Sequence, residues 1–211
     1  ARSRGLPLQI HAAQSVVEFH EITRRHGMTP VAWLESLGVL GPGTVIGHAI
    51  FLDHHSWVHW PGERDLARLA ATGTAVAHCP GVFQRRGITL QSLGRYLRAG
   101  VRIGIGTDTY PHNMLEELRS ALYCSRIAAG DVNDLKTTDV IDAATIGGAA
   151  ILGRDDIGRL TPGAKADLVV VDVTHPAMLP LRDPLKSLVY VAAERAVDDV
   201  FVDGVQVVAD G

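Results

Sequence analysis

Hydrophobic and polar residues follow one another along the chain in blocks that predict short buried strands, each followed by a polar loop and a helix. Uninterrupted apolar runs are typical of parallel strands that are covered on both faces. Such runs occupy residues 7–10, 44–47, 74–77 and 101–105. Apolar residues at helical spacing lie at 15–25, 29–40, 63–71, 89–99, 115–129 and 138–152. The first 153 residues therefore predict an α/β fold of successive βα units.

Local signals set several helix boundaries. Ser15, followed three residues later by Glu18, predicts a capping box that gives Glu18 a structural role, and Gly27 ends that helix. Gly153 is expected to close the last helix in the left-handed conformation. Residues 79–87, between the third strand and the next helix, are expected to form a loop.

Beyond Gly153 the pattern changes to strands without helices. Residues 167–172 predict one strand, and 200–202 and 205–207 flank Asp203-Gly204, a strong hairpin signal. The sequence thus predicts two domains, an α/β unit over residues 1–153 and a small β unit over residues 154–211.

Composition excludes several classes of partner. The chain has 211 residues, 46% of them hydrophobic, and a net charge of −3, so no basic surface for nucleic acid is expected. No apolar run approaches the roughly 18 residues that span a membrane. Cys79 and Cys124 are too few for a disulfide framework, which favours the cytoplasm. The chain begins with Ala1 and shows no signal peptide, and we expect it to start within a longer protein.

Four residues at the strand ends are the candidates for chemistry: His11, His48, His78 and Asp108. Parallel strands with helical crossovers place their carboxyl ends at one rim, where such enzymes build their sites. A single histidine is more often structural, but three at equivalent positions together with an acid favour a shared site. The alternative for Asp108 is a cap for the helix beginning near Asn113. A nucleotide-binding doubly wound domain is disfavoured because no strand end carries a glycine-rich phosphate turn.

The motifs around these residues resemble those of a known family. They are Ile10-His11-Ala-Ala-Gln14, Gly47-His48-Ala, Ala77-His78-Cys79-Pro80, Gly106-Thr107-Asp108-Thr109, and the stretches 158–172 and 202–205. They resemble the amidohydrolase superfamily, in the branch that contains cytosine, guanine and S-adenosylhomocysteine deaminases and triazine chlorohydrolases. The resemblance implies the C-terminal half of a (β/α)8 TIM-type barrel, strands five to eight, with a small β-sandwich unit.

The resemblance also implies roles for the strand-end residues. His11 and Asp108 would hold one divalent metal ion, zinc with iron as the alternative. Asp108 would also take a proton from water, His48 would orient that water, and His78 would complete the catalytic group. Such a metal lowers the pKa of bound water toward about 7 and supplies hydroxide. The family's His-x-His pair on its first strand has no counterpart in this sequence, so this chain alone is expected to bind metal poorly.

One position departs from the family pattern. Gln14 stands where the deaminases have a glutamate that transfers a proton, and an amide does not exchange protons at useful pH. Gln14 is therefore predicted to bind substrate, with His78 or water as the acid, or else to be a plain rim residue. Arg85 is predicted to meet an anionic group of the substrate, with a solvated loop charge as the alternative.

Two other features are weaker candidates for a functional role. Cys79 is disfavoured as a nucleophile because it follows His78 on a strand, where neighbouring side chains point to opposite faces. A second cluster of three histidines, at positions 54, 55 and 59, is either another metal group, a substrate-facing loop or a solvated one.

Together these features predict a metal-dependent hydrolase that acts through metal-bound hydroxide on a carbon–nitrogen (non-peptide) or similar bond of a small heterocyclic substrate. The alternative is a catalytically incompetent fragment or pseudoenzyme with a role in assembly. Four parallel strands leave two apolar edges, which soluble proteins do not normally expose. A homo-oligomer is therefore expected, with a small-molecule substrate as the other partner.

Overall fold

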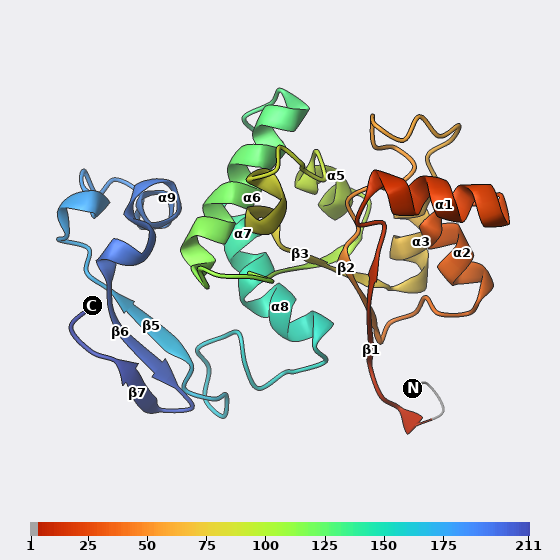
Figure 1. Ribbon diagram of the computed structural model, residues 1–211. Coiled ribbons are helices and arrows are strands. Elements are labelled where there is room, and N and C mark those ends of the chain that lie inside the picture. The colour runs from red at the N-terminus through yellow and green to blue at the C-terminus, as the bar shows by residue number, and fades with distance from the viewer. Residues whose placement is uncertain (1–3) are drawn as a thin grey trace.

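A four-stranded parallel sheet forms the centre of the larger part of the molecule (Figure 1). The computed structural model describes residues 4–211, without the side chains of residues 193 and 194. The strands stand in sequence order and comprise β1 (Leu8–Ala12), β2 (Thr44–His48), β3 (Ala75–His78) and β4 (Arg102–Ile105). All three pairings are parallel, so the predicted α/β fold is confirmed.

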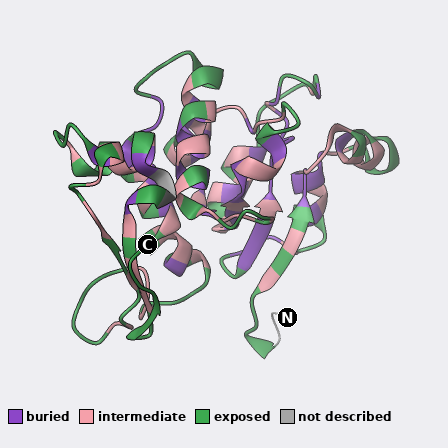
Figure 2. Ribbon diagram, turned by 60° about the vertical axis from the view of Figure 1, so that its left-hand side comes forward, coloured by how far each residue is buried: buried purple, intermediate pink, exposed green. Residues whose placement is uncertain are grey.

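Helices cover this sheet and bury its apolar residues in one core. They are α1 (Val16–His26), α2 (Pro30–Ser36), α3 (Asp65–Thr72), α4 (Pro80–Gln84), α5 (Leu93–Arg98), α6 (Met114–Ala129), α7 (Thr137–Ala144) and α8 (Ile146–Ile151). Ile46 and Val76 on the central strands are fully buried, as is Phe19 on α1. Figure 2 shows the buried residues gathered around the sheet, while β1 at its edge is largely exposed or half-buried.

The predicted cap of the first helix is confirmed in part. The Ser15 hydroxyl accepts a hydrogen bond from Glu18 N at 3.1 Å, and Gly27 ends α1 with a φ of 68°. The carboxylate of Glu18, however, accepts from the backbone of Ala13 and Gln14 instead of Ser15. Glu18 is structural, but it fixes the turn before the helix.

Two predictions about helices were wrong. Residues 80–84 form α4 where a loop was expected, because Pro80 suits the first helical turn and Phe83 is buried. The helix predicted over 138–152 is broken at Thr145. A side chain at Gly147 would lie 2.8 Å from the carbonyl oxygen of Ile103, so the glycine lets α8 pack directly on β4.

The C-terminal part contains a three-stranded antiparallel sheet of β5 (Leu168–Val171), β6 (Val197–Val202) and β7 (Val205–Val208). Asp203 and Gly204 both have positive φ, 51° and 80°, so the predicted hairpin is confirmed.

The expectation of strands alone beyond Gly153 was wrong. Helical turns fill the connection between β5 and β6: η2 (Pro176–Met178), α9 (Pro184–Ser187), η3 (Leu188–Ala192) and η4 (Ala193–Ala196). Pro176 and Pro184 each begin one of these helical turns, and Val189 is buried in the main core. The division at residue 153 stays a prediction. Within residues 4–211, no helix combines the length and hydrophobicity needed to cross a bilayer.

Candidate metal and active site

Three side chains from different strands converge at one end of the parallel sheet. His11 lies on β1, His48 ends β2, and Asp108 follows β4. One ligand atom from each lies within 4.8 Å of the others. His48 Nε2 is 3.9 Å from Asp108 Oδ2, and the two imidazole centres are 5.1 Å apart. The structure thus brings together both predicted metal ligands and the histidine predicted to orient water.

A glycine makes room for the first of these ligands. The strand register pairs His11 with Gly47, which immediately precedes His48. A Cβ atom at position 47 would lie 3.1 Å from Cδ2 of the His11 ring, which is tighter than ordinary packing. Gly47 therefore lets the His11 imidazole lie across the neighbouring strand toward His48.

The chain leaves the strands in unusual backbone conformations at this site. Ala13, His48, Ala49 and Asp108 all have φ between 46° and 74°. Residues other than glycine rarely adopt this left-handed region, and they do so most often at active sites where surrounding contacts enforce it.

Contacts from outside the site hold these turns. The buried Tyr96 hydroxyl donates to the carbonyl oxygen of Ala49 at 2.7 Å, directly after His48. The carbonyl oxygen of Ala13 accepts from the backbone of Ile50 and Phe51, at 2.9 and 2.8 Å. The turns after β1 and β2 are thereby tied together, which fixes His11 and His48 relative to each other.

Hydrogen bonds to its backbone amide fix the position of Gln14. The two carboxylate oxygens of Glu18 accept from the amide groups of Ala13 and Gln14, at 2.7 and 2.8 Å. The Gln14 side chain is half-buried and lies three residues beyond His11. The same carboxylate therefore holds the turn that carries the departure from the family pattern.

His78 ends β3 and does not belong to the convergent group formed by His11, His48 and Asp108. Burial, with His48 adding to the effect, lowers the pKa of His78 to about 3, and its Nδ1 has no hydrogen-bond partner among the described residues. A neutral ring is favoured, which argues against His78 as the acid. Burial raises the pKa of the Cys79 thiol to about 12, which argues against Cys79 as a nucleophile.

Glu117 was missed by the sequence analysis. It is buried on α6, and its Oε2 accepts from Gly81 N at 2.8 Å, which holds the turn after His78. Burial raises its pKa, and Asp108 is among the charges that act on it. Its position one turn before the buried Ala121 placed it on the apolar face of the helix, which was the available signal.

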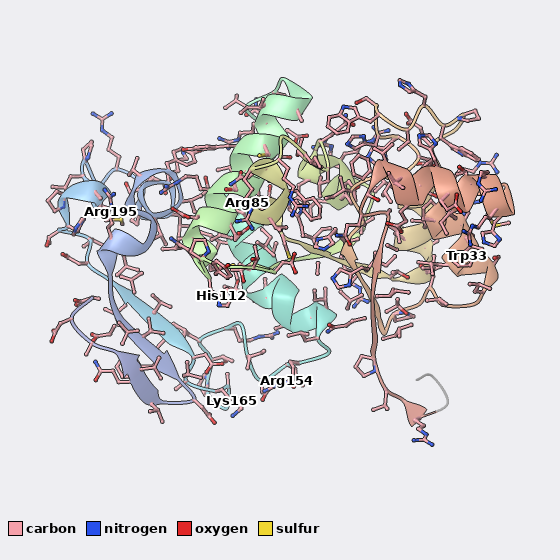
Figure 3. The ribbon with its side chains drawn as sticks, in the orientation of Figure 1. Trp33, Arg85, His112, Arg154, Lys165 and Arg195 are labelled. Carbon is pink, nitrogen blue, oxygen red and sulfur yellow. The ribbon has the colours of Figure 1, made fainter. Side chains whose placement is uncertain are left out.

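The remaining predicted residues lie as follows. Arg85 is exposed at the end of α4, which packs against α6 (Figure 3). Asn113, not Asp108, caps α6, because the Asn113 side chain accepts from Glu116 N, so the capping alternative for Asp108 was wrong.

The second histidine cluster is not a metal group. His55 Nε2 is 3.0 Å from the carbonyl oxygen of Thr89, the His54 side chain is buried near Asp53, and His59 is exposed. In the part of the chain that the structure describes, only His11, His48 and Asp108 form a group with metal-ligand spacing.

Comparisons with known proteins identify one matching family. Residues 1–207 match the model of the "Amidohydrolase family". The 5-methylthioadenosine/S-adenosylhomocysteine deaminase of Pelotomaculum thermopropionicum is 35% identical over 208 residues, 97% of this chain and 46% of that protein. The 5′-deoxyadenosine deaminase of Methanothermobacter thermautotrophicus is 33% identical over 100% of this chain and 48% of its own length.

Two solved structures are similar along the whole chain. An adenosine deaminase from Xanthomonas campestris with bound zinc superposes with a TM-score of 0.86 at 27% identity, and 47% of it is covered. Atrazine chlorohydrolase TrzN from Arthrobacter aurescens TC1, complexed with zinc, gives 0.84 at 25% identity, with 46% covered. The chain spans about half the length of the relatives it matches.

Proposed function

Because this chain belongs to the amidohydrolase family, we propose that the protein is a metal-dependent hydrolase acting on a carbon–nitrogen or similar bond of a small heterocyclic molecule. The convergence of His11, His48 and Asp108 from three strand ends is the observation that carries the proposal. Relatives named as deaminases of adenosine derivatives and as a triazine chlorohydrolase support the substrate class.

The same reasoning extends to the fold. Four parallel strands in sequence order, in a chain covering about half of each relative, support the C-terminal half of a (β/α)8 barrel for residues 1–153. The antiparallel sheet supports residues 154–211 as part of a β-sandwich unit. The homo-oligomer stays a prediction, to be checked by sedimentation of the full-length protein.

The donor set fits one divalent metal ion. The His11 imidazole and the Asp108 carboxylate are ligands that zinc takes in catalytic sites, and Gly47 gives the His11 ring the space to lie toward His48. When bound, such an ion lowers the pKa of water toward about 7 and so provides a nucleophile at neutral pH.

Three side chains of the protein have the other roles in the reaction. Asp108, exposed at the end of its strand, accepts the proton of the attacking water. Burial lowers the pKa of His48, so its ring is held neutral beside Asp108 and orients that water by a hydrogen bond. Arg85, exposed at the end of α4, meets an anionic group of the substrate.

Gln14 limits the leaving groups that the site can serve. Its amide hydrogen-bonds the heterocycle but delivers no proton to a ring nitrogen or an amine. A leaving group that departs without a proton from this position, such as chloride, therefore suits the site better than ammonia does.

The test uses the full-length protein. Metal analysis is followed by a screen of aminated, chlorinated and amide-bearing heterocycles for hydrolysis. Asp108→Asn should lower activity at least about 100-fold and reduce metal content, because it removes both charge and basicity. Asp155→Asn, at an exposed aspartate, is the matched control. Full activity and full metal content in Asp108→Asn would overturn the proposal.

A further inference from the structure

A cavity of about 410 Å³ lies between the helices of the larger part and α9. None of its lining residues belongs to the convergent group of His11, His48 and Asp108. The residues that matter for its chemistry are Arg126 from α6, Lys136 and Thr137 at the start of α7, and Asp183, Lys186 and Tyr190 from the α9 region. From these residues we infer a binding site for the phosphate group of a small molecule.

The charge of the cavity is positive. Three cationic side chains line it, and Asp183 is the acidic residue among the lining residues. The Asp183 carboxylate accepts from Lys186 N and lies 3.3 Å from Lys186 Nζ. Among the described residues, neither Arg126 nor Lys136 forms a salt bridge, so their charges are available to an anion.

The start of α7 supplies neutral donors. Its first residue, Thr137, is 6% exposed, and its buried hydroxyl lies beside the Tyr190 side chain without a well-formed hydrogen bond among the described residues. A buried hydroxyl without a well-formed hydrogen bond is costly, so this position gains from a further polar partner. The amide groups of a helix N-terminus also favour an anion. The nearby Asp139 carboxylate is bonded to Lys136 N.

Arg126 is held in place before any ligand arrives. Its Nε donates to the carbonyl oxygen of Leu135 at 2.9 Å and its Nη1 to the Tyr190 hydroxyl at 2.9 Å, which leaves Nη2 for a ligand. Burial acts to raise the pKa of Tyr190, but Thr137, Arg126 and Lys186 together hold it below its ordinary value. The Tyr190 hydroxyl therefore lies in a positive local potential.

The arrangement fits a phosphate better than a planar carboxylate. Cationic side chains line the cavity from α6, the start of α7 and α9, and a phosphate group, with about −1.5 to −2 charges and three acceptor oxygens, can meet more than one of them. The volume falls within the roughly 300–1,000 Å³ of small-molecule sites, so a phosphomonoester with an organic body has space. Leu185 and Val132 line the cavity and offer that body apolar contact.

The experiment is calorimetric titration of the full-length protein at constant ionic strength, with inorganic phosphate and with glycerol phosphate. Binding should be saturable. Lys186→Gln and Thr137→Val should each weaken it about tenfold, which corresponds to 1.4 kcal/mol. Thr137→Ser keeps the hydroxyl and should bind as the wild type does. Lys165→Gln is the matched control, since Lys165 is paired with Asp203 at an exposed position outside the cavity.

The outcomes separate the possibilities. Equal weakening in Lys165→Gln and Lys186→Gln would mean that net charge alone attracts phosphate, and absence of saturable binding would overturn the site. Glycerol phosphate should bind more tightly than inorganic phosphate. Binding of inorganic phosphate alone would identify the free ion as the ligand and overturn the claim of an organic body. Circular dichroism melts of every variant exclude unfolding as the cause of lost binding.

Discussion

Asp65 makes the stability of the protein depend on pH in a direction opposite to that of most carboxylates. The residue is 0% exposed at the start of α3. Burial, followed by the charge of Asp53, raises the pKa of Asp65 from 3.8 to about 6. The Thr29 hydroxyl donates to it at 2.7 Å, and Arg68 Nη1 lies 3.8 Å away, which offsets only part of the effect.

The size of the effect on the free energy of unfolding follows from the pKa shift of Asp65. About two pKa units correspond to roughly 3 kcal/mol between the protonation states. Because the folded pKa lies above the unfolded value, the contribution of Asp65 to stability is fully present below about pH 4 and is lost as the pH rises through about 6. Asp65→Asn cannot ionise and should escape this loss.

Urea denaturation of the full-length wild type and Asp65→Asn at several pH values measures the effect. The free energy of unfolding of the variant, relative to the wild type, should rise by up to about 3 kcal/mol between pH 4 and pH 7. The contributions of the other titratable groups cancel when the unfolding free energies of the variant and the wild type are subtracted. Asp155→Asn, at an exposed position, should show no such trend. A difference for Asp65→Asn that is flat across this range would refute the reasoning.

Three other substitutions test the site. Gly47→Ala should lower the metal content, because its Cβ would lie 3.1 Å from the His11 ring and displace it. Unchanged metal content by elemental analysis would contradict this. Tyr96→Phe should lower the free energy of unfolding by about 1–3 kcal/mol, since it leaves a buried carbonyl unpaired, whereas the exposed Tyr110→Phe should not; thermal and urea melts decide. Gln14→Glu should raise ammonia release from aminated heterocycles relative to the wild type, and an unchanged rate would show that this position does not steer the reaction.

Local sequence determined most of the elements and identified the candidate site residues. Alternation of buried strands with helices is enough to place the ends of parallel strands at one rim, so His11, His48 and Asp108 were identifiable as neighbours. Ser15, Gly27 and the Asp203-Gly204 turn act through their nearest neighbours in the chain, and the structure has them as predicted.

Only the tertiary structure decided how these residues are held. Glu18 binds the backbone of Gln14 instead of completing a capping box, and Tyr96 reaches the turn after His48 from a helix far along the chain. The helical turns after Pro176 form because their apolar residues are buried, some against the main core, which no local signal reveals. The cavity between α6, α7 and α9 joins segments distant in sequence. Local patterns fix the conformation of a few residues at a time, whereas burial and hydrogen bonding between distant segments depend on the packing of the whole fold.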